Sequence, residues 1–391
     1  MRYDFNRTIN RSGTDSVKYD LLEPVFGTSD LLPMWVADMD FEVADFIREA
    51  IAERVKHPVY GYTFRSGEFQ ETIASWLLRR HGWEVSPGAI NFSPGIVPAL
   101  NLCVMEFTEP GDRIVVQPPV YFPFFSAVKN HDRELVYNQL LEKEGKYEMD
   151  FEQLEVEFKK GASMFFLCHP HNPVGRAWTR VELEKLASLC VQYNVLVVSD
   201  EIHSDLLLFG NRHIPLASLG KDIADLTLTC IAPSKTFNLA GLYTSAVVAT
   251  NPELKLRYDR ILDVVHVGGD NILGQVALKA AYTDGDEWLD QLIGYLENNY
   301  TLLSQLLQEA VPEVIVSPLE ATYLTWLDFS SLGLDDKELK SFIIRKARLG
   351  LNDGPMFGPG GEQHQRINIA TQSDVIREAV SRLTSAIAEA R

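Results

Sequence analysis

Apolar positions along the first half of the chain fall into two patterns, helical stripes and short continuous runs. Residues 45–56 and 68–80 carry apolar side chains at three- and four-residue spacing, which predicts two helices, the second closed by His81-Gly82. From Ile90 onward, short β-branched and apolar runs alternate with helical segments. The runs that are apolar on both faces are residues 113–117, 164–168, 195–199, 226–231 and 245–250. Buried parallel strands covered by helices have this pattern, so the sequence predicts an α/β fold.

Two helix starts in this half are marked by local sequence. Residues 91–100 read Asn-Phe-Ser-Pro-Gly-Ile-Val-Pro-Ala-Leu, a glycine-containing turn that leads into a helix. Backbone N–H groups at such a start can hold a phosphate, although turn-to-helix junctions with glycine are common. Thr179 and Glu182 have the spacing of a capping box and open a helix with apolar residues at 183, 186, 189, 190 and 193.

The pattern changes after about residue 285. A long helix is predicted over 288–310, short strands over 314–316, 323–329 and 367–369, and an amphipathic C-terminal helix over 375–387. The first 45 residues are polar and irregular, an arm that must lie across the body of the chain or across a partner subunit. We therefore expect a large domain over 46–285, and a small α+β domain formed by 1–45 and 286–391.

Composition and charge narrow the classes of protein to consider. The chain has 391 residues, of which 46% are hydrophobic, and this length favours about two domains. Its net charge of −18 argues against a nucleic acid or an anionic membrane as partner. The N-terminus shows no apolar run behind a basic start, and 18 consecutive apolar residues occur nowhere, so neither a signal peptide nor a membrane span is expected.

The cysteines point to a reducing compartment. They lie far apart and lack the paired spacing of metal ligands: Cys103, Cys168, Cys190 and Cys230. Three of them sit in or beside strongly apolar runs, where a cysteine behaves as a small hydrophobe. We expect reduced core residues in a cytoplasmic protein.

The stretch Ala-Pro-Ser-Lys-Thr-Phe-Asn at residues 232–238 places Lys235 directly after a predicted buried strand. A lysine there is costly unless its charge is used or its pKa is lowered. Most lysines are solvated surface residues, so Lys235 alone is a weak candidate for a Schiff-base lysine. Three further segments strengthen it: Tyr121 behind two prolines, Asn172 in His-Asn-Pro-Val-Gly-Arg, and Asp200 with His203 in Ser-Asp-Glu-Ile-His. In this order they are what a pyridoxal-phosphate (PLP) site needs.

These segments belong to a set of motifs that spans the chain. Residues 34–41 read Met-Trp-Val-Ala-Asp-Met-Asp-Phe, residues 60–63 Tyr-Gly-Tyr-Thr, and residues 168–176 Cys-His-Pro-His-Asn-Pro-Val-Gly-Arg. With 199–203 and 233–238, they resemble the motifs of the MalY/PatB-type carbon–sulfur lyases, which are cystathionine β-lyase-like members of the class I/II aminotransferase superfamily. The resemblance covers nearly the whole chain. The arm motif and the Pro-Ser-Lys-Thr-Phe-Asn run are more specific to the lyase group than the motifs that aminotransferases share.

The resemblance implies a fold and a reaction. The fold is the PLP-dependent, aminotransferase-like fold type I, with a large α/β domain around a mainly parallel seven-stranded sheet and a small α+β domain. The reaction is α,β-elimination from cystathionine, cysteine or another S-substituted cysteine, which yields a thiol, pyruvate and ammonia. A thiolate is a competent leaving group because the pKa of its parent thiol is only ~8.5.

Carried over residue by residue, the resemblance assigns roles around the cofactor ring. Lys235 would bind PLP as a Schiff base and, once freed, take the substrate Cα proton. Asp200 would pair with the pyridine nitrogen, and Asn172 would hydrogen-bond the phenolic oxygen. Tyr121 would stack on the ring face, and His203 would lie near the same phenolic oxygen.

The resemblance also implies a phosphate site shared between subunits. The backbone amides of Gly95, Ile96 and Val97 and the hydroxyl of Ser234 would hold the phosphate. Tyr62 would reach the phosphate of the neighbouring subunit, so a homodimer with its active site at the subunit interface would be needed for activity.

The substrate α-carboxylate would be clamped by Arg366, whose planar fork suits a carboxylate, with Ala37 and Asn172 beside it. Without the resemblance, we would interpret Arg366 as half of a surface ion pair. The other candidates also have structural interpretations: Asp200 as a cap or turn residue, Asn172 as the turn residue of Asn-Pro-x-Gly, Tyr121 as a core aromatic, and His203 as a packing residue.

Four departures from the family pattern bear on the site. Tyr243 stands where many aminotransferases have a second arginine, and Ala232 where many relatives have serine. The phosphate site is therefore less cationic and depends on backbone amides and Ser234. His169 replaces a common asparagine or serine. Residues 363–365 read Gln-His-Gln where a glycine-phenylalanine pair is common, which indicates an atypical substrate pocket.

Three rival functions remain open from the sequence. An aminotransferase would use the same residues and return the proton to the cofactor. A non-catalytic regulator would use the acidic surface, although it would be expected to have lost the lysine, aspartate and asparagine of the site. A metal hydrolase using His169, His171, Asp200 and His203 rests on weak ligand spacing. The glycine-rich residues 358–361 lack the strand-turn-helix context of a nucleotide fingerprint.

Overall fold

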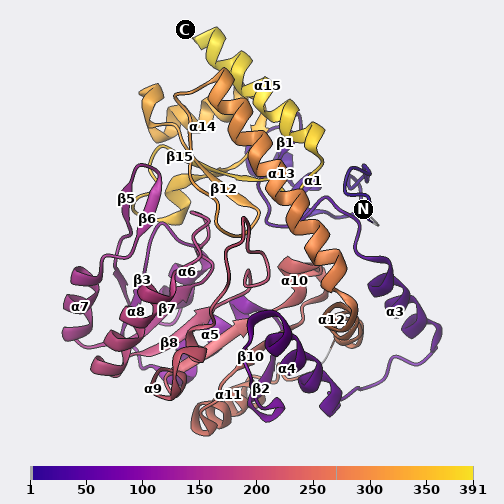
Figure 1. Cartoon of the computed structure of the whole chain (residues 1–391), viewed down its shortest axis with the longest axis vertical. Helices are drawn as coiled ribbons and strands as arrows, with labels where there is room; N and C mark the ends of the chain where they lie inside the picture. Colours follow the sequence, from indigo (N-terminus) through magenta and orange to yellow (C-terminus); the bar gives the residue numbers. More distant parts are fainter. Residues whose placement is uncertain (1–2, 270, 391) are drawn as a thin grey trace.

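The computed structural model describes residues 3–269 and 271–390 and is built around a seven-stranded sheet (Figure 1). The strand order is β2-β10-β9-β8-β7-β3-β4. The strands are β2 (Ile90–Ser93), β3 (Arg113–Val116), β4 (Glu134–Tyr137), β7 (Ala162–Cys168), β8 (Leu196–Asp200), β9 (Thr227–Ile231) and β10 (Ser245–Val248). All neighbours from β9 to β4 pair in parallel, and β10 is antiparallel to both β9 and β2. The mainly parallel seven-stranded sheet is confirmed.

The five strands predicted from apolar runs are present, but two sheet strands were not predicted. β4 lies at the edge of the sheet and buries only Val136 fully, so its sequence carries a weak apolar signal. β2 is fully buried, but it was interpreted only as part of the turn that leads into the next helix.

Helices cover both faces of this sheet. One face packs against α5 (Ile96–Phe107), α6 (Pro123–Lys129) and α11 (Pro252–Val264), and the other against α7 (Phe151–Lys159) and α8 (Arg180–Tyr193). Alternate residues of β7 enter the two layers, with Met164, Phe166 and Cys168 on one side and Phe165 and Leu167 on the other. Burial on both faces explains why these strands are continuously apolar.

A second, four-stranded antiparallel sheet belongs to the C-terminal part of the chain. Its order is β11-β12-β15-β14, with β11 (Ile315–Val316), β12 (Leu324–Asp328), β14 (Asn352–Asp353) and β15 (His364–Asn368). The long helix α13 (Asp286–Ala310) packs beside the C-terminal helix α15 (Ser373–Ala390), and α14 (Asp336–Arg345) lies near the same sheet (Figure 1). The division into domains at residues 45 and 285 stays a prediction.

The N-terminal arm packs against its own chain. Phe5 contacts Phe41, Trp288 and Tyr295 edge-on or tilted, within the same apolar cluster as α13 and α15. The prediction that the arm is irregular is only partly right, because it forms α1 (Val17–Asp20), α2 (Leu22–Phe26) and β1 (Leu32–Pro33), which pairs in parallel with β13 (Leu349–Gly350). These elements are too short to leave a periodic signal in the sequence.

The remaining elements complete the frame. They are α3 (Asp45–Lys56), α4 (Gly67–His81), α9 (Lys221–Ala224), α10 (Pro233–Thr236), α12 (Ile272–Asp284) and the hairpin β5 (Leu141–Lys143) and β6 (Lys146–Glu148). The capping box of Thr179 and Glu182 is confirmed at the start of α8. No helix in the described part of the chain combines the length and apolar character needed to cross a bilayer.

Two glycines allow a test of how α4 ends. Gly82 caps α4 with a φ of 64° in the left-handed region, and a Cβ there would meet nothing within 4 Å. Gly294 lies inside α13 with equally open surroundings. We expect Gly82→Ala to destabilise the protein by about 1 kcal/mol, because only its backbone conformation is penalised. Gly294→Ala should stabilise it by roughly 0.5–1 kcal/mol, because alanine is the better helix former.

Urea-induced unfolding of both variants measures this pair of effects. The midpoint should move to lower urea concentration for the first variant and to higher concentration for the second. An unchanged midpoint for Gly82→Ala would mean that the left-handed cap does not end this helix.

Candidate active site

The predicted site residues meet at the carboxyl ends of the central strands, where open α/β sheets bind ligands. Asp200 ends β8, and α10, which carries Lys235, begins two residues after β9. A cavity of about 430 Å³ lies at this edge. Eleven of the twelve predicted residues line it: Ala37, Gly95, Ile96, Val97, Tyr121, Asn172, Asp200, His203, Ser234, Lys235 and Arg366.

Lys235 projects into the cavity with an amine that is easily deprotonated. Its Nζ donates a hydrogen bond to the carbonyl oxygen of Ala37 at 2.7 Å. Burial, reinforced by the positive charge of Arg366, lowers the pKa of Lys235 to about 8, against the opposing charges of Asp38 and Asp200. The amine is therefore available as a nucleophile and base near neutral pH, as the sequence prediction requires.

Asp200 is a buried carboxyl group whose pKa is shifted in the opposite direction from that of Lys235. Burial raises its pKa to about 7, although a backbone hydrogen bond from Ile202 and the charge of Lys235 act to lower it. The Ile202 N–H donates to Oδ1 at 3.2 Å, so the turn interpretation holds as well. A buried carboxylate in this position gains free energy from a cationic N–H partner, which a protonated pyridine ring supplies.

Arg366, on β15, reaches the same cavity from the second sheet. Its guanidinium donates to Asn172 Oδ1 at 2.9 Å, to the Trp35 carbonyl at 3.0 Å and to Asn352 Oδ1 at 2.6 Å. Burial lowers its pKa to about 10. The structural alternative of a surface ion pair is wrong, because Arg366 is buried and, within the described residues, its guanidinium donates to amide and carbonyl oxygens. A buried cation without an acidic partner is suited to binding a carboxylate.

Asn172 is fixed beside this arginine by the same hydrogen bond. It also belongs to a turn, in which the N–H of Gly175 donates to the His171 carbonyl at 2.8 Å. Gly175 has a φ of 72°, and a Cβ there would lie 2.5 Å from Leu319. The site and turn interpretations of Asn172 are therefore compatible.

His203 and Tyr121 complete the walls around the expected ring position. Burial lowers the pKa of His203 well below its ordinary value, so the imidazole is neutral, and its Nδ1 has no hydrogen-bond partner. His203 also packs edge-on against Tyr323, with ring centroids 6.0 Å apart. Burial raises the pKa of Tyr121, which stays a neutral aromatic. Both residues line the cavity, and their contacts with a cofactor stay predictions.

The helix start predicted for phosphate binding is confirmed. α5 begins at Ile96 behind Gly95, and the first N–H groups of a helix have no intrahelical acceptors. Their position at the positive end of the helix dipole suits an anion. Tyr243 and Ala232, the two departures at this site, also line the cavity. Phosphate binding by these residues and Ser234 stays a prediction.

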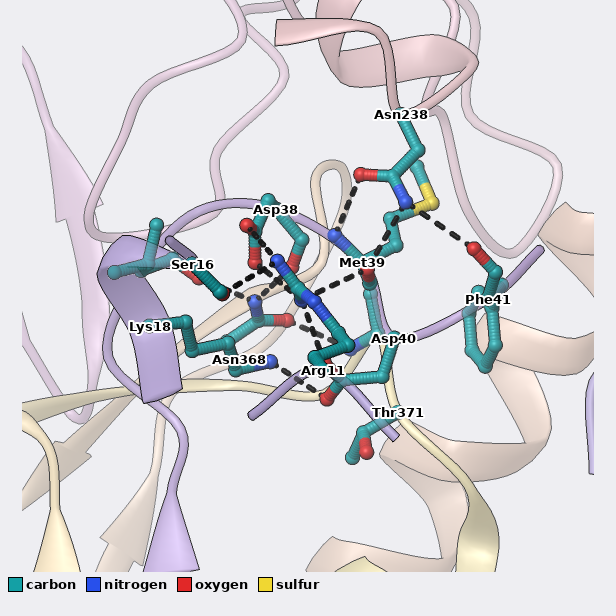
Figure 2. A network of polar contacts seen from close by, with 12 residues as sticks. Arg11, Ser16, Lys18, Asp38, Met39, Asp40, Phe41, Asn238, Asn368 and Thr371 are labelled. Atoms are coloured by element: carbon teal, nitrogen blue, oxygen red, sulfur yellow. Dashed lines mark hydrogen bonds and ion pairs between the residues drawn. The ribbon is translucent and has the colours of Figure 1, made fainter. Parts of the chain in front are cut away.

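Residues 35–41, which we call the strap, begin at the cavity, which Trp35, Val36 and Ala37 line. The hydrogen bonds that fix the strap were not predicted from the sequence. Asn368 Nδ2 donates to the carbonyls of Val36 and Asp38, each at 2.6 Å. The hydroxyl of Tyr323 donates to the Ala37 carbonyl at 3.0 Å. Asn238, three residues after Lys235, accepts from the Met39 N–H and donates to the Met39 carbonyl (Figure 2).

Several of these partners carry no local signal in the sequence. Tyr323 and Asn352 lie outside every motif that was singled out, and Asn368, two residues after Arg366, falls in the predicted strand 367–369 with no role assigned to it. Asn238 belongs to the motif around Lys235, and its φ of 58° in the left-handed region is typical of asparagine.

Two departures lie outside the cavity. His169 is buried, its Nε2 lies 3.2 Å from the Ile214 carbonyl, and its ring lies 4.4 Å from that of His213. Within residues 363–365, Gln363 donates to the Leu334 carbonyl and His364 stacks on Trp326. None of these residues lines the cavity, so they do not support the inference of an atypical pocket, which stays a prediction.

The metal-hydrolase alternative has no support in the geometry. His171 Nε2 lies 2.9 Å from the Pro119 carbonyl, and His169 faces Ile214. Within the described ranges, no group of three histidine, cysteine, aspartate or glutamate side chains could hold a metal ion.

Tyr62 is the one predicted site residue that its own chain does not bring to the cavity. It is fully exposed on the segment between α3 and α4, at the periphery of the molecule (Figure 1). Val59, Tyr60 and Phe64 on the same segment are also exposed.

A lysine of lowered pKa, a buried aspartate and a buried arginine meet at this sheet edge, an arrangement that suits a PLP-dependent enzyme. Comparison with known proteins agrees: residues 30–383 match the family described as "Aminotransferase class I and II", to which the chain belongs.

Its relatives include carbon–sulfur lyases. The chain is 44% identical to cystathionine β-lyase PatB of Bacillus subtilis (strain 168), over 98% of this chain and all of that protein. It is 31% identical to protein MalY of Escherichia coli (strain K12), over the full length of both. Among solved structures, PLP-containing cystalysin from Treponema denticola superposes with a TM-score of 0.96 at 36% identity, covering both chains completely. The PLP-bound carbon–sulfur lyase from Staphylococcus hominis superposes with a TM-score of 0.91 at 32% identity, covering 98% of each.

The residues of the cavity fit PLP. The unpartnered Nδ1 of His203 and the buried carboxylate of Asp200 offer polar atoms to the ring, and Lys235 offers an amine of lowered pKa. The start of α5 offers backbone N–H groups to a phosphate.

The lowered pKa of Lys235 predicts how the apoprotein takes up PLP. Only the neutral amine attacks the cofactor's aldehyde, so the uptake rate should rise with pH and level off above about pH 8. An ordinary lysine would continue to gain reactivity toward its usual pKa of ~10.4. Absorbance of the bound cofactor, followed after mixing at a series of pH values, measures the midpoint.

Two variants control this experiment. Lys235→Ala should form no covalent attachment after borohydride treatment, whereas Lys221→Ala, at an exposed surface position, should behave as the unaltered protein. A rate that still climbed at pH 10 would contradict the buried position of the Lys235 amine.

Proposed function

We propose that this protein is a PLP-dependent carbon–sulfur β-lyase, which converts cystathionine, cysteine or another S-substituted cysteine to a thiol, pyruvate and ammonia. The observation that carries the proposal is the 44% identity to a cystathionine β-lyase along the whole chain, with eleven predicted site residues around one cavity. Cystalysin and the staphylococcal carbon–sulfur lyase share the same fold at 36% and 32% identity.

Substrate binding follows from the charges of the cavity. Arg366 pairs with the substrate α-carboxylate as a bidentate fork, and Asn172, held by Arg366 NH1, keeps the guanidinium in orientation. Ala37 lies on the strap and bounds the same space. The side chains of Trp35, Val36, Ala37 and Tyr121 line this space and would exclude water, which would strengthen these charged contacts.

Proton movement is assigned to Lys235. Its neutral amine takes the Cα proton, and the resulting ammonium is held near the Ala37 carbonyl. Asp200 holds a proton on the cofactor's ring nitrogen. When bound, PLP supplies a conjugated ring that accepts the electron pair left at Cα. Cleavage of the Cβ–S bond would then release a thiolate, which the ammonium of Lys235 can protonate. Water would hydrolyse the remaining aminoacrylate to pyruvate and ammonia.

The lyase is favoured over the aminotransferase alternative by the pattern of similarity. The relatives named cystathionine β-lyase include proteins at 44% and 30% identity, whereas the LL-diaminopimelate aminotransferase of Nitratidesulfovibrio vulgaris is 26% identical. A non-catalytic regulator is disfavoured because Lys235, Asp200 and Asn172 are all present in one cavity.

The product balance tests the reaction directly. The PLP-loaded protein, incubated with L-cystathionine or S-methyl-L-cysteine and no 2-oxo acid, should release pyruvate and thiol continuously in equal amounts. Arg366→Lys should raise KM about tenfold or more while the cofactor stays bound, because lysine cannot form the bidentate pair. A single turnover that stops until a 2-oxo acid is added would make the protein an aminotransferase instead.

The active unit is proposed to be a homodimer in the cytoplasm. The segment between α3 and α4 exposes Val59, Tyr60, Tyr62 and Phe64, an apolar surface that a second copy of the chain would cover. Tyr62 would then reach the phosphate of the partner's cofactor. All four cysteines are buried and unpaired, which suits a reducing compartment.

Subunit complementation tests the shared site. Tyr62→Ala and Lys235→Ala should each have little activity, but in a hybrid dimer one site contains an intact lysine and an intact partner tyrosine. Random mixing should therefore restore about a quarter of the original activity, since half of the dimers are hybrids with one intact site. Mixtures that stay inactive would place Tyr62 outside the partner's site.

A further inference from the structure

The strap is fixed from two sides. Toward the cavity, its carbonyls at Trp35 and Ala37 accept hydrogen bonds from Arg366 and Lys235, the two cations of the site. Toward the N-terminal arm, its acidic residues Asp38 and Asp40 meet a second pair of cations. A shift of the strap on the arm side would therefore move the two carbonyl groups to which Arg366 and Lys235 donate.

Arg11 makes the principal contact on the arm side (Figure 2). Its guanidinium donates to both carboxylate oxygens of Asp38, at 3.0 and 2.5 Å, and to Asp40 Oδ1 at 2.8 Å. It also donates to the Met39 carbonyl at 3.2 Å and to Ser16 Oγ at 3.2 Å. One side chain thus binds three successive residues of the strap.

Lys18 completes the cluster from α1. Its side chain is fully buried, and Nζ donates to Asp40 Oδ2 at 2.6 Å. Although burial alone would raise it, the pKa of Asp40 lies below its ordinary value because of Lys18 and Arg11. Two cations therefore balance two carboxylates, and loss of one leaves a desolvated charge without its partner.

We propose that Arg11 is a positioning residue of the active site, which holds the strap in place and neutralises Asp38 on the side that faces Lys235. The proposal rests on the proposed function only in that Lys235 must bind PLP, and it is independent of whether the reaction is an elimination or a transamination.

The charged groups that face Lys235 determine in which direction loss of Arg11 shifts the pKa of Lys235. They are Arg366 on β15, Asp200 at the end of β8, and Asp38 on the strap, while the imidazole of His203 is neutral. Arg366 lowers the pKa of Lys235, and Asp38 and Asp200 raise it. Removing Arg11 leaves Asp38 uncompensated, which favours the ammonium form of Lys235. Removing the Asp38 charge has the opposite effect.

The experiment measures the pH midpoint of PLP uptake by the apoprotein of three variants. Arg11→Gln should raise the midpoint, and Asp38→Asn should lower it, each by on the order of half a pH unit. The double variant Arg11→Gln/Asp38→Asn should return toward the midpoint of the unaltered protein, because the charges balance again. The matched control is Arg7→Gln in the same arm, whose exposed ion pair with Glu42 should leave the midpoint unchanged.

A merely structural role predicts a different outcome. Both single variants break the Arg11–Asp38 pair, so loosening of the strap would hydrate Lys235 and move both midpoints upward together. Shifts in the same direction, or no shift in either variant, would overturn the proposal. If Arg11→Gln failed to fold, the direction in which Asp38→Asn shifts the pH midpoint of PLP uptake would still test the proposal. The product balance described above tests the proposed function separately.

Discussion

Burial of several ionisable groups in one cavity is the constraint on which the rest of the structure depends. Asp200 and Arg366 are buried and Lys235 is half-buried, and desolvation shifts the pKa of each in the direction that favours its neutral form. Such groups persist only where the fold supplies compensating contacts. In the proposed function, the same desolvation would make Lys235 a usable base and Arg366 a carboxylate-binding group, so the cost in stability and the chemistry would have one origin.

The compensating contacts come from four distant parts of the chain. The central sheet contributes Asp200 at the end of β8, and the following strand leads to Lys235. The second sheet contributes Arg366, and the arm contributes the strap, whose carbonyls accept from both cations. The cavity is therefore complete only when the arm and both sheets are packed together, which couples folding of the whole chain to formation of the site.

The cavity contains residues that a lyase and an aminotransferase would both need, and also residues that depart from the family pattern. A lyase and an aminotransferase both need proton transfer, ring protonation and carboxylate binding, which are the roles proposed for Lys235, Asp200 and Arg366. Tyr243 and Ala232 line the cavity, where they would make the proposed phosphate site less cationic, whereas His169, Gln363 and His364 form contacts outside the cavity. Departures from a family pattern thus have functional meaning only where the fold brings them to the cavity.

The sequence by itself determined the α/β class, five of the seven central strands and the helix start at Gly95. These features are local, because strand burial and helix starts depend on neighbouring residues. The eleven predicted residues of the cavity came from the resemblance of the sequence motifs to the carbon–sulfur lyases. It did not determine that Ala37 accepts from Lys235, that Tyr323 and Asn368 hold the strap, or that Arg11 binds Asp38 and Asp40. Those contacts join residues far apart in the chain, and pKa values depend on burial that only packing creates. Tertiary structure alone decided which hydrogen bonds fix the strap and how far the pKa values of the site residues are shifted.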